Sequence, residues 1–380
     1  MPGTGEGREL SAKIRHMDLS PTHEPATRTV VVRRFAEFLA LQPQWDPLLE
    51  ASENGVVFAR WDWIRIWLEV FETPEASLAI ICVWRGNALI GLAPLWIQAR
   101  QKFGLKIRTL RFLGTGEAEQ DEVLPEMLDV ICRRADADLV ACAVAAALTA
   151  GLQWDTAVFD HVLQGSVFES GVLPRLGHLT PATGGKNGTR YCLQWQPGEV
   201  PRLTAPVEYK RRKLRRKGTV QYQCVTDLSG WEAAFEVLKN LHTKRWRERG
   251  IPGVFASPQF TRFHRKLAQC WCAQGGMQIH LLHLEGRPVA ALYNLCWRGV
   301  EYFYQCGVDV HLKGQSAGVA LHAFAIERAA HGRSIAYDFL GGEAHSYKGA
   351  FGAPPEPLLG WSLARQTWRG RLGRRLQRNG

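Results

Sequence analysis

The chain has 380 residues, of which 46% are hydrophobic and 22% are charged. This composition excludes a disordered chain, which lacks the apolar side chains needed to offset the entropy of ordering, and it excludes collagen-like repeats. The 47 Lys and Arg outnumber the 36 Asp and Glu, so the formal net charge is +11. At about 150 residues per domain, the length predicts two domains.

The first half of the chain is predicted to combine helices with a strand hairpin. Residues 1–27 are rich in Gly, Pro and Thr, and we expect a flexible N-terminus there. Residues 61–71 place apolar side chains at spacings of three and four, which predicts an amphipathic helix. Strands are predicted at 28–33, 78–84, 88–95, 107–113 and 156–159, and a further helix at 138–149.

The second half repeats this order of elements. Its helices are predicted at 231–249, 260–273 and 318–331, and its strands at 277–284, 288–297, 300–306 and 334–339. In each half a hairpin leads to a third strand, a helix and a strand, an order that predicts a mixed β-sheet flanked by helices. We therefore expect an α/β fold with two tandem domains. Their predicted order is an N-terminal domain at 28–196, a Pro-rich linker at 197–208, a C-terminal domain at 209–362 and a basic tail at 363–380.

Two short segments carry most of the positive charge. Seven cations lie within 210–217 and six arginines within 365–378, and together they exceed the net charge of +11. They are either a solvated helix face and a frayed tail, or a site for an anionic partner such as a phosphorylated cofactor, an RNA or a membrane surface. Only Tyr209 offers an aromatic ring beside the first segment, so we expect no sequence-specific nucleic-acid binding.

The cysteines and the apolar runs indicate a cytoplasmic protein. The nine cysteines form no Cys-x-x-Cys pair, which favours reduced, packed thiols and gives no support to a metal site. Residues 1–20 contain no apolar core of a secretory signal. The longest apolar run, 139–152, is shorter than the roughly 20 residues that a membrane-spanning helix needs. We therefore expect no transmembrane segment, and peripheral contact only through the basic segments.

One strand-to-helix junction has the character of an anion site. The strand ending at Cys306 is followed by Gln315-x-x-Gly318-x-Ala320 at the start of a predicted helix. The first N–H groups of a helix have no intrahelical partner, and small residues allow a pyrophosphate to approach them. An ordinary strand-to-helix turn is the alternative.

The spacing of Gln315, Gly318 and Ala320 resembles the acyl-CoA pyrophosphate loop of GNAT acyltransferases. A longer ordered set resembles the acetyltransferase family that includes the cellulose-biosynthesis protein CelD, which is itself similar to Fem-type peptidyltransferases. That set comprises Arg245-Trp246, Phe255-Ala256, Gly286–Ala290, Gly307-x-Asp309, Asp338-Phe339, Gly341 and Tyr347-Lys348, with Trp61-Asp-Trp63, Gly91–Leu95 and Phe112–Gly114 in the first half.

The resemblance implies two tandem GNAT-like domains, of which the second binds acetyl-CoA or another acyl-CoA as co-substrate. The residues that it implies for this binding are Val308, Val310, Gln315, Ser316, Ala317, Gly318, Val319 and Ala320. The corresponding stretch of the first half, 113–122, is acidic. It would repel a pyrophosphate, and it either faces an amine or is a solvated loop.

The resemblance also implies the catalytic residues. Tyr347 is expected to protonate the leaving thiolate, with Lys348 lowering its pKa. Asp338, Glu343 and His345 are the candidates for the general base. In each case a structural role is the alternative: Asp338 pairs with an arginine, His345 lies in a surface loop, and the Tyr347-Lys348 pair only packs.

We therefore expect an acyl-CoA-dependent N-acyltransferase, acetyl-CoA being the first candidate donor. The expected acceptor is an amine or a hydroxyl of a small molecule or saccharide. The expected process is exopolysaccharide, cellulose or cell-envelope biosynthesis. Two alternatives stay open. One is a Fem-type transferase that uses aminoacyl-tRNA, and the other is a non-catalytic accessory module of a polysaccharide assembly system.

Overall fold

The computed structural model describes residues 26–71, 76–102, 104–177, 182–312, 316–343 and 346–378. The elements of the first half are β1 (Thr27–Val32), α1 (Phe35–Leu39), α2 (Gln42–Ala51), α3 (Trp61–Phe71), β2 (Ala76–Leu78), β3 (Ile80–Arg85), β4 (Ala88–Ala93), β5 (Leu95–Lys102), β6 (Leu105–Phe112), β7 (Ile131–Cys132), α4 (Ala137–Ala146), β8 (Thr156–Leu163), α5 (Leu173–Arg175) and β9 (Thr183–Gln194).

The second half continues the alternation of helices and strands. Its elements are α6 (Ala205–Arg215), β10 (Val220–Val225), α7 (Leu228–Arg247), α8 (Pro258–Trp271), β11 (Met277–Leu284), β12 (Arg287–Trp297), β13 (Val300–Val308), α9 (Ala317–His331), β14 (Ala336–Gly342), β15 (Pro355–Ala364) and α10 (Trp368–Arg378). Within the described ranges, no helix combines the length and the apolar character that crossing a membrane requires.

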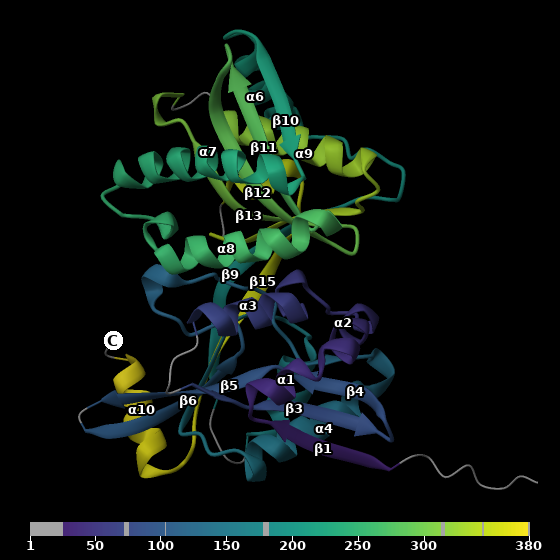
Figure 1. Cartoon of the computed structure of the whole chain (residues 1–380), viewed down its shortest axis with the longest axis vertical. Coiled ribbons are helices and arrows are strands. Elements are labelled where there is room, and N and C mark those ends of the chain that lie inside the picture. Colours follow the sequence, from purple (N-terminus) through teal and green to yellow (C-terminus); the bar gives the residue numbers. More distant parts are fainter. Residues whose placement is uncertain are drawn as a thin grey trace, which may run out of the picture.

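One large sheet runs through both halves of the molecule. Its eleven strands follow the order β10-β11-β12-β13-β14-β9-β15-β8-β6-β5-β2, and a smaller sheet has the order β1-β3-β4-β7. In Figure 1 the second half lies above the first, and β9 and β15 extend from one to the other. β15 belongs to the second half in sequence, yet it pairs with β8 and β9 of the first half. The two halves are therefore joined by main-chain hydrogen bonds.

The predicted duplication is confirmed. In the first half β5 pairs antiparallel with β6, and β6 pairs in parallel with β8, with α4 between them in sequence. In the second half β12 pairs antiparallel with β13, and β13 pairs in parallel with β14, with α9 between them. Each half is thus a mixed sheet flanked by helices, as expected.

The predicted strand at 88–95 is divided in the structure. β4 ends at Ala93 and joins the small sheet, whereas β5 begins at Leu95 and joins the large one. Pro94 lies between them and has no N–H to donate to a ladder. A proline at this position therefore allows one continuous run of apolar residues to serve two sheets.

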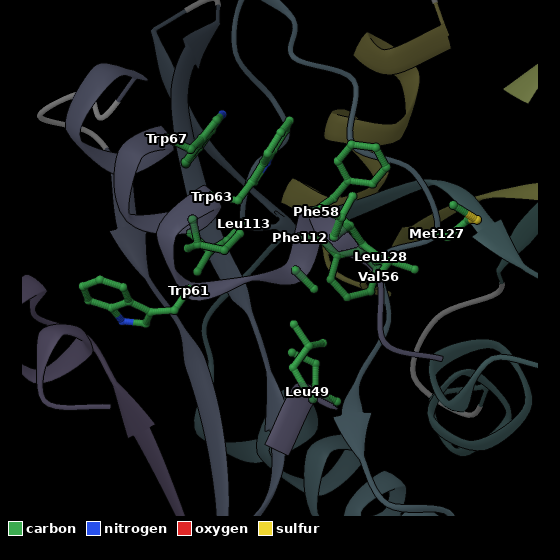
Figure 2. Close-up of a cluster of buried hydrophobic side chains, with 14 of the residues drawn as sticks. Leu49, Val56, Phe58, Trp61, Trp63, Trp67, Phe112, Leu113, Met127 and Leu128 are labelled. Atoms are coloured by element: carbon green, nitrogen blue, oxygen red, sulfur yellow. The ribbon is translucent and has the colours of Figure 1, made fainter. Parts of the chain in front are cut away.

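A shared aromatic core holds the halves together. Figure 2 shows Trp61, Trp63 and Trp67 of α3 beside Phe58 and Phe112. The ring of Trp63 packs edge-on against Phe263 of α8, with the ring centroids 4.8 Å apart. The predicted apolar stripe of α3 is buried, and Trp63 is buried as well because α8 covers a second face of the helix.

The two basic segments form helices. α6 packs on α9, where Arg211 forms ion pairs with Glu208 at 2.9 Å and with Glu327 at 2.5 Å. The other segment is not a frayed tail, because it forms α10, which packs on β6, β8 and β15 (Figure 1). Gly373 of α10 faces the sheet, Gly370 lies against the backbone of Arg365, and several arginines of the helix face solvent.

Candidate active site

The site begins where two parallel strands separate. β13 and β14 pair only between Val300–Tyr302 and Ala336–Asp338, and beyond these residues no ladder joins them. A cavity of about 360 Å³ lies in the second half beside the unpaired end of β13, and Cys306 and Val308 of this strand line it. The divergence of the two strands thus exposes a side of β13 that an intact sheet would cover.

Lys348 stabilises the separated end of β14. Its Nζ donates to the carbonyl oxygens of Phe339 at 2.6 Å and Leu340 at 3.4 Å, and also to that of Gly341. Burial lowers the pKa of Lys348, while the carboxyl groups of Glu126 and Asp338 oppose that shift. The ammonium therefore satisfies backbone acceptors at the point where β14 has left β13.

The N-terminus of α9 opens into the cavity. Ser316 precedes the helix in the left-handed region, with φ +57°, and Ala317, Gly318 and Val319 line the cavity. The first N–H groups of a helix have no intrahelical acceptor, and the helix dipole favours negative charge beside them. A Cβ added at Gly318 would lie 3.2 Å from Cγ2 of Val308, so a larger side chain here would occupy space between α9 and β13.

Most of the residues expected to bind acyl-CoA meet at this cavity. Those that line it are Val308, Val310, Ser316, Ala317, Gly318 and Val319. Ala320 is fully buried in the hydrophobic core and is not among the lining residues. Gln315 lies outside the described residues.

Tyr347 lies at the cavity, as the resemblance implied. It begins the short helix Tyr347–Phe351 that follows β14, and the residue as a whole is 41% exposed. Its hydroxyl oxygen lies 3.1 Å from Nε2 of His322. Desolvation, with a smaller effect of Cys306, raises the pKa of Tyr347, so the expected lowering by Lys348 is wrong. The phenol consequently stays protonated near neutral pH and is available as a donor.

His322 is a cavity residue that the sequence analysis missed. It lies on α9, one turn after Gly318, and is 1% exposed. Burial lowers the pKa of His322 well below its ordinary value, so the imidazole is neutral. A spacing of i, i+4 from Gly318 places both on one face of the helix, and this was the signal that could have identified it.

The predicted base candidates do not lie at the cavity where the structure describes them. Asp338 is fully buried, and its Oδ2 lies 2.6 Å from Nη2 of Arg190, so it forms the ion pair considered as its alternative role. Glu343 is exposed, and its backbone carbonyl accepts a hydrogen bond of 3.2 Å from the Tyr191 hydroxyl. His345 lies outside the described residues. Neither Asp338 nor Glu343 lines the cavity.

The opposite wall of the cavity comes from the end of α7 and the residues after it. Arg245 and Arg249 line it, and Nη1 of Arg245 donates to Sγ of Cys306 at 3.3 Å. Two carboxylates also line the cavity, those of Glu248 and Asp309. The two arginines and the two acidic residues balance in charge, so the positive end of the α9 helix dipole is what favours an anionic ligand here.

The acidic stretch of the first half lines a second cavity, of about 430 Å³. Glu117 points inward and accepts hydrogen bonds from the Val123 N–H at 2.8 Å and from Nε1 of Trp67 at 3.3 Å. Burial raises the pKa of Glu117 to about 7. Glu119, by contrast, is exposed at the rim. The stretch is therefore partly a cavity wall and partly a solvated loop.

Comparison with known proteins places this site in a family context. Residues 203–349 match the family model described as an acetyltransferase (GNAT) domain. No curated protein matches the chain. Among solved structures, FemX is similar with a TM-score of 0.59 and 11% identity, over 88% of this chain and 98% of that one. A conserved protein of unknown function from Bacteroides thetaiotaomicron is similar with a TM-score of 0.51 and 11% identity, over 89% of this chain and 100% of that one.

At such low identity the solved structures bear on the fold alone. They extend over both halves of the chain, and the predicted fold of two tandem GNAT-like units is confirmed, with one sheet shared between them. The family match covers the cavity, α9 and Tyr347. The region at 203–349 is therefore similar to GNAT acetyltransferase domains.

Proposed function

We propose that this protein is an acyl-CoA-dependent acyltransferase, with acetyl-CoA as the first candidate donor. The observation that carries the proposal is the cavity beside the separated strands β13 and β14, into which the N-terminus of α9 opens. It combines unpaired N–H groups, a glycine that leaves room for a ligand, and a protonated tyrosine in one pocket.

In the proposed complex the N–H groups of Ala317, Gly318 and Val319 hold the pyrophosphate. The thioester lies toward Tyr347, a residue that follows β14 in sequence and lines the cavity. An acceptor amine attacks the carbonyl carbon, and Tyr347 protonates the departing thiolate. Glu248 and Asp309 take the place of Asp338 and Glu343 as candidates for the group that receives the amine proton, because they line the cavity.

The acceptor is proposed as an amine or hydroxyl of a small molecule or a saccharide. This part of the proposal, and a role in exopolysaccharide, cellulose or cell-envelope biosynthesis, rests on the resemblance to the CelD family. A Fem-type transfer from aminoacyl-tRNA and a non-catalytic accessory role are the competing proposals. Acyl-CoA binding with turnover supports the first reading, tRNA-dependent transfer the second, and neither activity the third.

The test is thermal stabilisation of the full chain by acetyl-CoA, longer acyl-CoAs and aminoacyl-tRNA. At about 100 times Kd, a ligand of the folded state stabilises it by about 2.7 kcal/mol. Gly318→Asp places a carboxylate beside the proposed pyrophosphate position and should abolish the stabilisation by acetyl-CoA. Gly151→Asp is the matched control, because a Cβ at Gly151 meets no atom within 4 Å and this residue is not part of the cavity.

Two outcomes would contradict the proposal. Undiminished stabilisation of Gly318→Asp by acetyl-CoA would exclude this cavity as the acyl-CoA site. Stabilisation by aminoacyl-tRNA in the absence of any acyl-CoA effect would favour the Fem-type reading.

A further inference from the structure

A buried chain of hydrogen bonds leads from the sheet interior to Tyr347. Nδ2 of Asn294 lies 3.4 Å from Oε2 of Glu301 and 3.3 Å from the Tyr337 hydroxyl. That hydroxyl lies 2.9 Å from Nδ1 of His322, whose Nε2 lies 3.1 Å from the Tyr347 hydroxyl. Asn294, Glu301, Tyr337 and His322 are each at most 2% exposed, so water does not compete for these bonds.

The direction of each hydrogen bond follows from the first member of the chain. The amide nitrogen of Asn294 can only donate, and Oε2 of the Glu301 carboxyl group beside it accepts in this orientation of the amide. The oxygen of Tyr337 therefore accepts from Asn294. Its single proton is then free for Nδ1 of His322, which lies 2.9 Å from the same hydroxyl oxygen.

The hydrogen bond at Nδ1 of His322 determines which atom donates at Nε2, on the side of Tyr347. His322 is enclosed by aromatic rings, the nearest being Phe303, whose centroid lies 4.5 Å away. In such an environment, with the Lys348 ammonium nearby, the ring is neutral and carries one proton. Because Nδ1 accepts from Tyr337, that proton is on Nε2, which donates to the oxygen of Tyr347.

We propose that Asn294 and Tyr337 hold His322 in its Nε2–H tautomer. The Nε2–H group then donates to the Tyr347 oxygen, which leaves the hydroxyl proton of Tyr347 directed toward the cavity. The inference deepens the proposed function, on which its catalytic part rests, by assigning His322 as a positioning residue. In the reverse direction Tyr347 would donate to His322, and its proton would not be available to a ligand.

The proton balance of the proposed reaction closes around Tyr347. The carbon–sulfur bond of the thioester breaks, and the sulfur takes the proton of the Tyr347 hydroxyl. The acceptor nitrogen forms the new bond to carbon and loses one proton to the receiving group, Glu248 or Asp309, which passes a proton back to the tyrosinate through solvent in the cavity. The Nε2–H group of His322 stabilises the tyrosinate in the interval, since a hydrogen bond to a charged acceptor is stronger than one to a neutral acceptor.

The tautomer itself is measured by nitrogen-15 NMR of the imidazole rings in the full-length protein, without any ligand. We expect a protonated Nε2 and an unprotonated Nδ1 for His322 at neutral pH. His322→Gln assigns the signals by removing them, and Tyr337→Phe provides a second assignment by shifting them. A proton on Nδ1, or on both nitrogens, would overturn the proposal whether or not the protein has acyltransferase activity.

Kinetics test the positioning role. His322→Leu removes the donor to Tyr347 and should lower kcat at least about tenfold, the lower part of the range for general acid catalysis, while acetyl-CoA affinity changes by less than about twofold. His322→Gln retains an N–H group and should keep kcat closer to that of the wild type. Tyr222→Phe is the matched control, because it breaks another partly buried Tyr–His hydrogen bond, the 2.8 Å bond to His280, at a place that does not line the cavity.

Equal losses in the Leu and Gln variants would overturn the positioning role, because packing alone would then explain them. If the tautomer is as proposed but Tyr347→Phe keeps full activity, the acid role in the proposed function fails and the hydrogen-bond chain stands. If the tautomer is reversed while Tyr347→Phe is inactive, the chain fails and the acid role stands.

Discussion

At the scale of single residues, a substitution of Tyr347 tests whether this side chain protonates the departing thiolate. A proton donor to the thiolate acts only as the thiolate leaves, so its loss weakens the transition state and not the ground-state complex. Tyr347→Phe should therefore lower kcat at least about tenfold and leave acetyl-CoA affinity nearly unchanged. Steady-state kinetics with a working acceptor and calorimetry with acetyl-CoA measure the two quantities. Tyr209→Phe, an exposed tyrosine on α6, is the control.

A collapse of affinity with kcat preserved would make Tyr347 a ligand contact only. No change in either quantity would assign protonation of the thiolate to another group or to solvent.

The sequence identified those cavity residues that belong to a short pattern of neighbouring positions. Gly318 and its neighbours were found because a small-residue turn before a helix has a recognisable spacing. Tyr347 came from the family resemblance. His322 was missed because its partners, Tyr337 and Tyr347, lie 15 and 25 positions away and are brought to it by β14. The partner of Asp338 is Arg190, 148 positions away, which no local pattern reveals.

At the scale of elements, the docking of α10 depends on glycine. A Cβ at Gly373 would lie 2.6 Å from Cγ2 of Thr156 and 3.2 Å from Cγ2 of Ile107. Gly373→Leu should therefore separate the helix from the sheet or strain the contact, at a cost of about 1–3 kcal/mol. Denaturant unfolding measures this change in the free energy of unfolding.

Arg371→Leu is the control for that variant, because Arg371 lies on the exposed face of the same helix. An unchanged free energy of unfolding in Gly373→Leu would mean that the contact between α10 and the sheet contributes nothing to stability.

Helices and strands were predicted correctly where apolar residues recur with a regular period. They were missed where small residues make the contact between a helix and the sheet. The apolar stripe of α3 gave its helix correctly, and the hairpins followed from their turns. The sequence of α10 is dominated by arginines and glycines, and its three apolar residues, Trp368, Leu372 and Leu376, were too few to predict a docked helix. The division at Pro94 was also missed, because the apolar run continues on both sides of the proline while the strand changes sheet.

At the scale of the whole molecule, buried histidines link stability to pH. Burial lowers the pKa of His264 and His280 to about 3 and that of His242 to about 4. Each binds a proton in the unfolded chain below pH about 6.5, so each contributes stability that is lost as the pH falls below that value. For one such histidine the loss between pH 7 and pH 5 is about 2 kcal/mol.

Buried carboxyls such as Glu126, whose pKa burial raises to about 7, act in the opposite direction, so the test must be differential. His264→Gln removes one such histidine. Between pH 5 and pH 7 the free energy of unfolding of this variant should therefore increase by about 2 kcal/mol less than that of the wild type. Denaturant unfolding at the two values measures this difference. His311→Gln, at an exposed histidine, should match the wild type; an equal response in both variants would refute the linkage.

The position of β15 between β8 and β9 has a consequence for synthesis on the ribosome. These two strands are complete long before residues 355–364 leave the exit tunnel, and until then each lacks the neighbour that the finished sheet provides. Unpaired strand edges are templates for pairing with other chains. The nascent first half therefore passes through a vulnerable interval that ends only when the last strand is inserted, and chaperone dependence should be greatest in that interval.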